Sequence, residues 1–302
     1  MRQAHRKTAL VTGANSGLGK AVALALAAEG ARVGMVARDR ARGAAALAEI
    51  QTATGNVDLH LFVADLADQT SLRALAESVL ARFDRLHLLV NNAGTAYPAR
   101  RLSPDGLECA LAVNHLAPFR LTQLLLDRLQ SSAPARIVNV GTRIEAAMNV
   151  EDLNWERRPY RSMQGYAPSK LGNLHFTFEL ARRLRGSGVT VNAVFPGVFR
   201  SNLGGTDGAQ GVFWKSVAAL FGWAIPAPEQ AARRVLYLAN APELEGVSGQ
   251  YFGHRKTLRA PAQARDPETN RRLWQISERL TGVDVPSPRP PEDARCFAAP
   301  PV

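Results

Sequence analysis

The chain has 302 residues, of which 46% are hydrophobic, as expected for one α/β domain with an extension. Its formal charge is +11, but the basic residues are interspersed with acids and form no long block, so nucleic-acid binding is not expected. The two cysteines have no metal-site or disulfide spacing, and no apolar run approaches the roughly 20 residues that span a bilayer. We therefore expect a cytoplasmic protein with no metal site and no transmembrane segment.

Short apolar runs alternate with amphipathic stretches of helical length along the first two-thirds of the chain. The runs contain almost no polar residues, which is typical of parallel strands buried on both faces. We predict an α/β fold with a single Rossmann-type doubly wound parallel sheet, strand order about 3-2-1-4-5-6-7, and helices on both faces. Ligands are expected beyond the carboxyl ends of the strands. The strands with the clearest signal are 9–12, 32–37, 59–64, 86–90, 136–140 and 189–195.

A glycine-rich segment, TGANSGLG, follows the first expected strand and precedes a helical pattern. Gly13, Gly17 and Gly19 allow a sharp turn and the close approach of a pyrophosphate, which then lies at the positive end of the helix. Glycines also occur in strand-to-helix turns that bind nothing, but the position between strand and helix favours a dinucleotide site. Ser16 and Leu18 belong to the same loop and are included in this site.

The second strand ends at Arg38, about twenty residues after the glycines, where an acid would bind the adenosine ribose of NAD. A guanidinium at this point suits a 2′-phosphate by its charge and its fork of donors. NADP(H) is therefore favoured over NAD(H). The neighbouring Asp39 is interpreted as the cap of the following helix.

The ends of the third and fourth strands contribute to the same expected edge of the sheet. Asp65 and Leu66 follow the third strand, and Asn91 and Ala93 follow the fourth within the sequence NNAG. Asp65 has two interpretations: it accepts a hydrogen bond from the adenine amino group, or it caps the helix beginning near Gln69.

Tyr166 opens another expected helix, and Lys170 lies four residues later on the same helix face. A phenol with a pKa of about 10 is a poor acid near neutrality, but a nearby ammonium favours the phenolate and lowers that pKa. The pair can then exchange a proton with an alcohol or a ketone. In isolation this spacing is common, and only the accompanying motifs make it informative.

The motifs TGANSGLG, NNAG, Asn114, YAPSK and Pro196-Gly197 occur in this order over about residues 7–253. Together they resemble the short-chain dehydrogenase/reductase family. The segments VNHLAPFRLT, EDLNWERRPYRSMQG, LGNLHFTFELARRL and RRLWQISERLTGV are most similar to its retinol-dehydrogenase-like branch, and the last extends the resemblance to residue 283.

The resemblance implies a role for each matching residue. Tyr166 would be the general acid for ketone reduction, and Lys170 would lower its pKa and bind the nicotinamide ribose, so both belong to the expected cofactor site. Asn114 would position a water in the proton relay. Asn91 and Val198 would line the nicotinamide half of the site.

The chain departs from the family pattern at the residue that binds the substrate oxygen, which is Thr142 in place of a serine. If its hydroxyl takes the serine's place, hydride transfer survives with a changed pocket, and if it points away, a few kcal/mol of stabilisation is lost. Arg143 and Glu145 are unexpected beside a retinoid, and either face solvent or bind polar groups of the substrate. The glycine-bounded, aromatic-rich segment 204–228 is interpreted as a lid over a lipophilic substrate, or as core or subunit-interface packing.

The sequence thus predicts an NADP(H)-dependent oxidoreductase that interconverts a ketone or aldehyde and an alcohol on a bulky, partly apolar small molecule. The alternatives are the same fold with non-redox chemistry, such as dehydration, epimerisation or cyclisation, and a redox-silent dinucleotide-binding scaffold. The family resemblance implies a homo-oligomer, a dimer or tetramer. The expected divisions are 1–256, a Rossmann-fold catalytic domain; 257–283, a C-terminal helical extension of the same domain; and 284–302, a proline-rich, disordered tail. Within the extension, Asp266 is expected to cap a helix.

Overall fold

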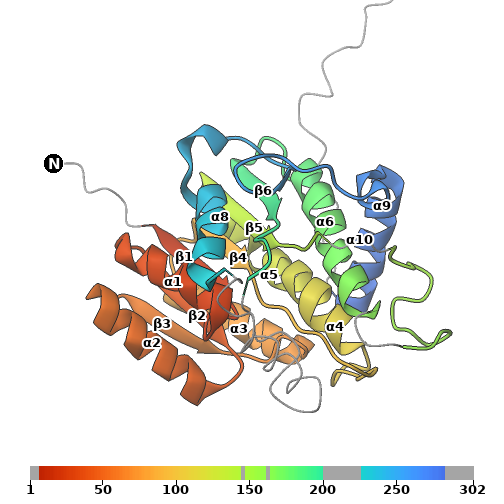
Figure 1. Ribbon diagram of the computed structural model, residues 1–302, viewed down its shortest axis with the longest axis horizontal. Helices are drawn as coiled ribbons and strands as arrows, with labels where there is room; N and C mark the ends of the chain where they lie inside the picture. The colour runs from red at the N-terminus through yellow and green to blue at the C-terminus, as the bar shows by residue number, and fades with distance from the viewer. Residues whose placement is uncertain (1–6, 144–146, 161–163, 200–225, 283–302) are drawn as a thin grey trace, which may run out of the picture.

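The computed structural model describes residues 7–143, 147–160, 164–199 and 226–282. In this part of the chain seven strands form one sheet in the order β3-β2-β1-β4-β5-β6-β7, and every pair of neighbours is parallel (Figure 1). The predicted fold class and strand order are confirmed. The strands are β1 (Thr8–Thr12), β2 (Arg32–Ala37), β3 (Leu59–Val63), β4 (Leu88–Asn91), β5 (Ala135–Val140), β6 (Val189–Val194) and β7 (Tyr251–Phe252).

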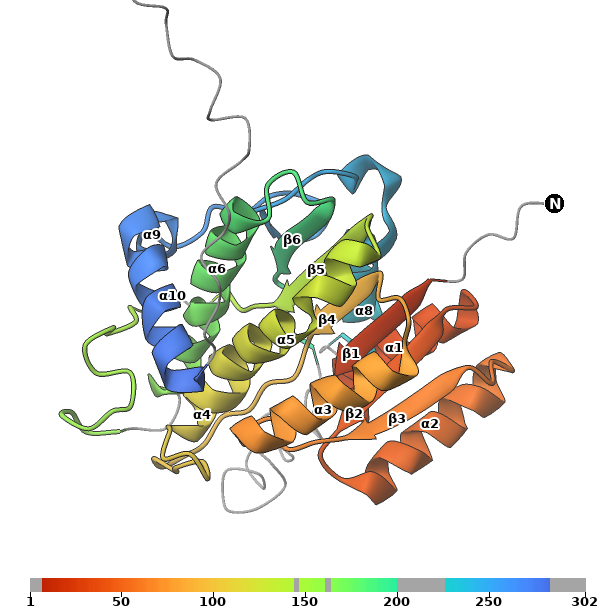
Figure 2. The ribbon, with the colours of Figure 1, turned by 180° about the vertical axis from the view of Figure 1, so that it is seen from behind.

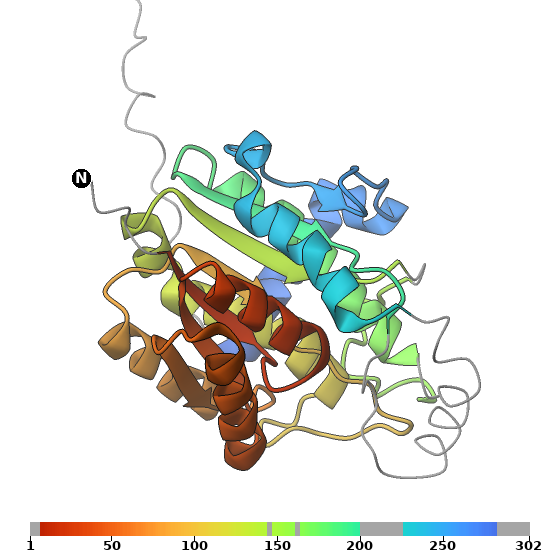
Figure 3. The same ribbon diagram turned by 60° about the vertical axis from the view of Figure 1, so that its left-hand side comes forward.

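Helices cover both faces of the sheet, which explains why the strands are apolar throughout (Figures 1 and 2). On one face, α1 and α8 lie side by side, with α2 next to α1 (Figure 3). The other face packs against α3, α5 and α6. The bounds are α1 (Gly17–Ala28), α2 (Arg40–Thr54), α8 (Pro228–Asn240), α3 (Gln69–Arg82), α5 (Ala117–Ser131) and α6 (Tyr166–Arg183).

Shorter elements complete the described chain: α4 (Cys109–Leu111), the π-helical turn η1 (Ala112–Leu116), the 3-10 turn η3 (Pro242–Leu244) and α9 (Ala262–Arg265). None of the helices in the described residues is long and apolar enough to cross a bilayer.

The last helix, α10 (Pro267–Thr281), begins and ends where the sequence indicates. The Asp266 carboxylate accepts hydrogen bonds from the backbone amides of Glu268 and Thr269, and Gly282 ends the helix in the left-handed conformation. The helix packs against α6. Its Trp274 ring lies 4.8 Å from that of Phe119, so α10 shares the core of the sheet.

Two capping predictions have different outcomes. Asp39 caps α2 as expected, accepting a hydrogen bond from the backbone amide of Arg42 at 2.8 Å. The interpretation of Asp65 as the cap of α3 is wrong, because Asp68 directly precedes the helix and accepts from the backbone amides of Thr70 and Ser71. Asp65 instead closes a local turn, accepting from the amide of Ala67 at 2.9 Å.

Several predictions lie outside the described residues. These are the proposed lid, apart from its last three residues at 226–228, the position of Glu145, and the tail 284–302. The division of the chain at residue 256 stays a prediction.

Candidate active site

The glycine-rich loop leaves β1 and enters α1 with the close packing that the motif predicts. Gly13 and Gly17 have positive φ angles of 66° and 52°. A Cβ atom on Gly19 would lie 2.2 Å from the Gly13 carbonyl oxygen, so only glycine allows helix and loop to approach this closely. Around Gly17 the space is open, and Ser16, which precedes the helix, makes no side-chain cap. The first amides of α1 therefore remain available to an anion, and the loop fits the pyrophosphate of a dinucleotide.

The other residues expected around the adenosine end differ in exposure. Arg38 follows β2 and is exposed, as a residue that binds a phosphate from solvent must be. Leu18 is buried in the core between the sheet and α1, so only its backbone can face a ligand. The Asp65 carboxylate is engaged by the Ala67 amide, and Leu66 packs against the core on the α3 side.

The end of β4 is held by buried hydrogen bonds. The side-chain amide of Asn91 donates to Asn139 at 2.8 Å and to Thr122 at 3.2 Å, so this side chain stabilises the sheet. Thr12 accepts hydrogen bonds from the backbone amides of Asn92 and Ala93, both at 3.0 Å, which fixes this turn beside the glycine loop.

Tyr166 and Lys170 lie on the first turns of α6, and both side chains are buried, with exposures of 8% and 3%. The Lys170 ammonium donates to the backbone carbonyls of Val140 at 3.2 Å and Ala93 at 3.4 Å, which directs it to the carboxyl ends of β4 and β5. Burial lowers the pKa of Lys170 to about 8.

The pKa of Tyr166 moves in the direction opposite to the expectation. Burial raises the pKa of the Tyr166 phenol. The Thr142 side chain acts in the opposite direction and lowers this pKa, but its effect is smaller than that of burial. The Lys170 ammonium donates to carbonyl oxygens at the strand ends.

Thr142 follows β5 and Gly141, and its hydroxyl lies beside the phenol of Tyr166. Its backbone is held from the other side, because the hydroxyl of Tyr251 donates to the Thr142 carbonyl oxygen at 2.9 Å. The threonine therefore has the neighbour that a serine in its place would need.

Asn114 lies in the π-helical turn η1 and is fully buried. Its amide nitrogen donates to the Thr95 carbonyl oxygen at 2.8 Å and to the Ser169 hydroxyl at 2.9 Å, and its oxygen accepts from the Thr95 amide at 2.7 Å. Such turns widen a helix by one residue and often occur at functional sites. The structure thus brings Asn114 to the same strand ends as Tyr166 and Lys170.

Val198 lies apart from this buried cluster and is 75% exposed, just after the loop at Gly197. Sequence reasoning did not identify Ser169, Thr95 or Tyr251. Each is defined by a partner that is distant in sequence, so no local pattern reveals it.

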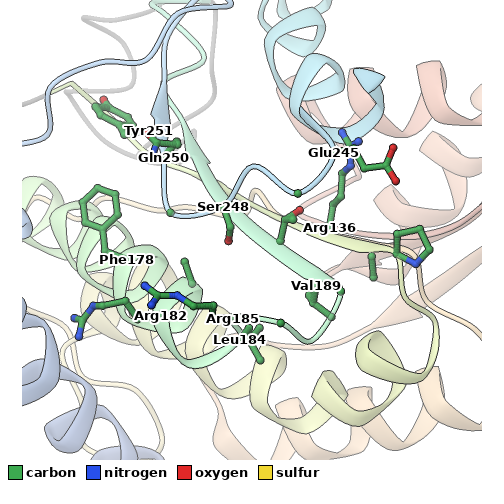
Figure 4. A pocket seen from close by; sticks show the side chains of 18 of the residues that line it. Arg136, Phe178, Arg182, Leu184, Arg185, Val189, Glu245, Ser248, Gln250 and Tyr251 are labelled. Atoms are coloured by element: carbon green, nitrogen blue, oxygen red, sulfur yellow. The ribbon is translucent and has the colours of Figure 1, made fainter. Parts of the chain in front are cut away.

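A hollow of about 1420 Å³ lies away from the candidate site (Figure 4). Arg136 and Val189, near the beginnings of β5 and β6, line it together with the last turns of α6. The residues that carry acid-base chemistry lie at the opposite, carboxyl ends of these strands. The candidate active site is therefore assigned to the carboxyl ends.

Comparisons with known proteins agree with this geometry. The family model described as short chain dehydrogenase matches residues 7–210. Human retinol dehydrogenase 13 is 42% identical over 287 residues, which cover 94% of this chain and 87% of that protein. Among solved structures, a protein from Mycobacterium paratuberculosis is 33% identical with a TM-score of 0.74, covering 93% of this chain and 95% of the other. A short-chain dehydrogenase from Burkholderia cenocepacia, in complex with NADP, is 31% identical with a TM-score of 0.62, covering 82% and 95%.

Proposed function

This chain belongs to the short-chain dehydrogenase/reductase family, with retinol dehydrogenases among its relatives, and from that premise we propose an NADP(H)-dependent enzyme that interconverts a ketone or aldehyde and an alcohol. Membership already makes the chain an oxidoreductase acting on CH–OH groups. The proposal adds the cofactor, the residue roles and a bulky, partly apolar small-molecule substrate.

One observation carries the proposal: an acid, a hydroxyl donor and a cation meet beside the glycine loop. The Thr142 side chain lies at the phenol of Tyr166. The Lys170 ammonium donates a hydrogen bond to the carbonyl oxygen of Ala93. The amide of Ala93 donates in turn to the hydroxyl of Thr12 at the end of β1. Groups from α6 and from the ends of β1, β4 and β5 thus converge at the edge of the sheet where a doubly wound fold binds its ligand.

A bound dinucleotide would supply or accept the hydride. In the reducing direction, the Tyr166 phenol gives its proton to the substrate oxygen, while the Thr142 hydroxyl donates a hydrogen bond to that oxygen as negative charge develops. Burial lowers the pKa of Lys170 to about 8. Near neutral pH its ammonium can therefore release and regain a proton more readily than that of an exposed lysine. In the oxidising direction the same groups act in reverse.

The preference for NADP(H) rests on Arg38 and on the solved relative whose complex contains NADP. The guanidinium is exposed at the end of β2, and the nearest acid, Asp39, is occupied by capping α2. The positive charge of Arg38 suits a 2′-phosphate, and the adjacent Asp39 carboxylate is directed to the start of α2 by its bond with the Arg42 amide.

The substrate class rests on the relatives named as retinol dehydrogenases, whose named substrate is a bulky, apolar alcohol. The chain's own Arg143, exposed next to Thr142, argues against assigning retinol itself. We propose a substrate that is only partly apolar.

The experiment is a screen of ketones, aldehydes and alcohols with the purified protein, following the absorbance of reduced cofactor with NADP(H) and with NAD(H). Turnover by the parent and its loss in Tyr166→Phe support the proposal. Conversion of a biosynthetic substrate without net cofactor consumption would instead indicate the non-redox alternative.

Two further expectations remain proposals. A cytoplasmic location is supported by the free, buried thiol of Cys109. A dimeric or tetrameric state is suggested by the family resemblance, and light scattering of the purified chain measures it directly.

A further inference from the structure

A second, smaller hollow of about 390 Å³ lies beside the candidate active site. Thr142 and Arg143 form one wall, and Tyr251 and Leu258 add an aromatic and an aliphatic surface. The remaining lining residues are Arg259, Ala260, Pro261, Ala262 and Arg265. Its size is at the lower end of the range for small-molecule pockets.

The lining is positively charged. Arg143, Arg259 and Arg265 are exposed, no acidic residue lines the hollow, and none of the three forms an ion pair with an acid in the described ranges of the chain. Arg265 uses one donor on the Ala260 carbonyl at 3.1 Å, which orients its guanidinium and leaves the other donors available.

The positive charge of Arg143 lies close to Tyr251, which contacts Thr142 of the candidate active site. Burial raises the pKa of Tyr251 to about 12, and the positive charge of Arg143 acts in the opposite direction, so this charge lies close to the Tyr251 phenol. The same phenol donates to the Thr142 carbonyl oxygen, and the Thr142 side chain acts to lower the pKa of Tyr166. One residue, Thr142, thus belongs both to the wall of the hollow and to the acid-base cluster.

The positive lining continues beyond this hollow. The larger hollow shares five lining residues with it: Tyr251, Leu258, Arg259, Ala260 and Arg265. It adds Arg185, which Figure 4 labels, and Arg182, which is paired with Glu179. The acid that lines the larger hollow, Glu245, lies near Arg136 at its far end (Figure 4). Lining arginines therefore continue from the smaller hollow into the larger one.

We propose that the substrate carries an anionic oxygen group, a carboxylate or a phosphate, which Arg143, Arg259 and Arg265 bind while the carbonyl lies between Thr142 and Tyr166. This inference rests on the proposed function, because it assigns a substrate class to the same site. Guanidinium groups suit both anions by their planar fork of donors, and the aromatic and aliphatic walls accommodate an apolar linker between the two ends of the molecule.

The test compares aldehydes that differ in charge. The rates kcat/KM are measured for para-carboxybenzaldehyde, for para-formylphenyl phosphate and for the neutral methyl para-formylbenzoate. The variants are Arg143→Gln, Arg259→Gln and the triple glutamine variant that includes Arg265→Gln. Lys256→Gln is the matched control, since this exposed cation follows β7 but lines neither hollow.

We expect the parent to prefer at least one anionic aldehyde over the ester by about tenfold or more, the least that a lost charge-assisted hydrogen bond would change. The triple variant should lose this preference while its rate with the ester stays nearly constant. Added salt should slow only the anionic substrates. The preferred anion distinguishes carboxylate from phosphate.

A binding measurement separates the two levels of the hypothesis. Calorimetry with para-carboxybenzyl alcohol and para-hydroxymethylphenyl phosphate, in the presence of oxidised cofactor, should show binding that weakens in the triple variant and not in Lys256→Gln. The inference is overturned if the parent reduces the ester and shows no preference for an anionic aldehyde. It is also overturned if kcat/KM for the anionic aldehydes falls equally in the arginine variants and in Lys256→Gln. Both results leave the proposed function intact. Arginine-dependent binding without turnover of any aldehyde overturns the proposed function, and supports the anion site alone.

Discussion

The side-chain amide of Asn114 donates a hydrogen bond to the hydroxyl of Ser169, 2.9 Å away and 55 positions later in the chain. Ser169 in turn donates to the backbone carbonyl of Tyr166 at 2.7 Å, one turn earlier in α6. This chain of bonds joins the π-helical turn to the helix that carries the proposed acid, so the position of Tyr166 depends on a residue from another element.

Replacing Asn114 by alanine should therefore affect both stability and rate. The substitution leaves the backbone groups of Thr95 and the Ser169 hydroxyl without their partner, and a buried unpaired polar group costs about 1–3 kcal/mol. We expect a loss of this size in urea unfolding, together with a lower kcat. Ser169→Ala is the control, because it removes one bond of Asn114 and leaves the two with Thr95. Equal stability of Asn114→Ala and the parent would show that the network carries no net energy.

Replacing Arg38 by aspartate should reverse the cofactor preference. The guanidinium is proposed to pair with the 2′-phosphate, and a lost charge-assisted hydrogen bond costs up to about 3 kcal/mol. Dissociation constants of NADPH and NADH, measured by fluorescence, should therefore rise strongly for NADPH and little for NADH. Arg40→Asp, an exposed charge change on the first turn of α2, is the control. Equal weakening of both cofactors argues against Arg38 as the selecting residue.

The fold was predictable because its strongest signals are local. Buried strands read as apolar runs, and the second expected strand matches β2 over 32–37. Asp266 and Gly282 mark the ends of α10 by their own chemistry. β7 gives no such signal, because it has two residues and is defined by its pairing with β6.

The site was predictable only in part, and for a related reason. The glycine loop and the spacing of Tyr166 and Lys170 are local patterns. The π-helical turn at Asn114 and the contact of Tyr251 with Thr142 depend on tertiary packing. The spacing of Tyr166 and Lys170 does not show how far the phenol is buried, and burial is what raises the Tyr166 pKa where the sequence predicted a lower one.

Removal of the Trp274 ring should destabilise the whole domain. The ring lies 4.8 Å from Phe119 and 6.0 Å from Phe176, and the Arg183 guanidinium lies 4.2 Å above it. Truncation of a buried aromatic residue costs about 3–5 kcal/mol, so the denaturation midpoint of Trp274→Ala should fall sharply. Trp274→Phe keeps part of the packing and should cost clearly less. A local loss of α10 with no change in global unfolding would show that the helix docks as a separate unit.

Stability should decline in mild acid because of His115. This side chain is buried between η1 and α10, 2.9 Å from the Ser277 hydroxyl, and burial lowers the pKa of His115 from 6.5 to about 3. As the pH falls below 6.5, the unfolded chain binds a proton at this residue while the folded protein does not, so the free energy of unfolding decreases. From about pH 7 to pH 5 this amounts to about 2 kcal/mol, at 1.4 kcal/mol per pH unit below the unfolded pKa.

The variant His115→Gln tests whether His115 causes the loss of stability in acid, because the pH dependence of its unfolding free energy can be subtracted from that of the parent. Other groups, including His175, whose pKa burial also lowers, contribute to both proteins and cancel. The parent should therefore lose more stability than the variant over this pH range, in urea unfolding at matched ionic strength. Parallel pH profiles would mean that the imidazole takes up its proton in the folded state as easily as in the unfolded one.

Thr142 is the residue whose role most needs a direct test, because it replaces the family's serine. Its side chain acts to lower the pKa of the Tyr166 phenol, whereas the loop that would contact the cofactor's pyrophosphate is formed by other residues. Changes at Thr142 should therefore alter hydride transfer and leave dinucleotide binding nearly intact. Thr142→Val preserves the shape and deletes the hydroxyl, and Thr142→Ser preserves the hydroxyl and deletes the methyl group.

We expect Thr142→Val to lower kcat/KM by about a hundredfold or more, the range seen when a donor to a developing oxyanion is removed. Thr142→Ser should retain activity and accept larger substrates, because the pocket gains the volume of a methyl group. Tyr166→Phe is the control that should nearly abolish turnover through loss of the acid. The valine variant should also lose the bond that opposes the effect of burial on the phenol, so the pKa of Tyr166 should rise further in it. If the valine variant matches the parent while the phenylalanine variant is inactive, Thr142 contributes packing only, and a different donor must hold the substrate oxygen.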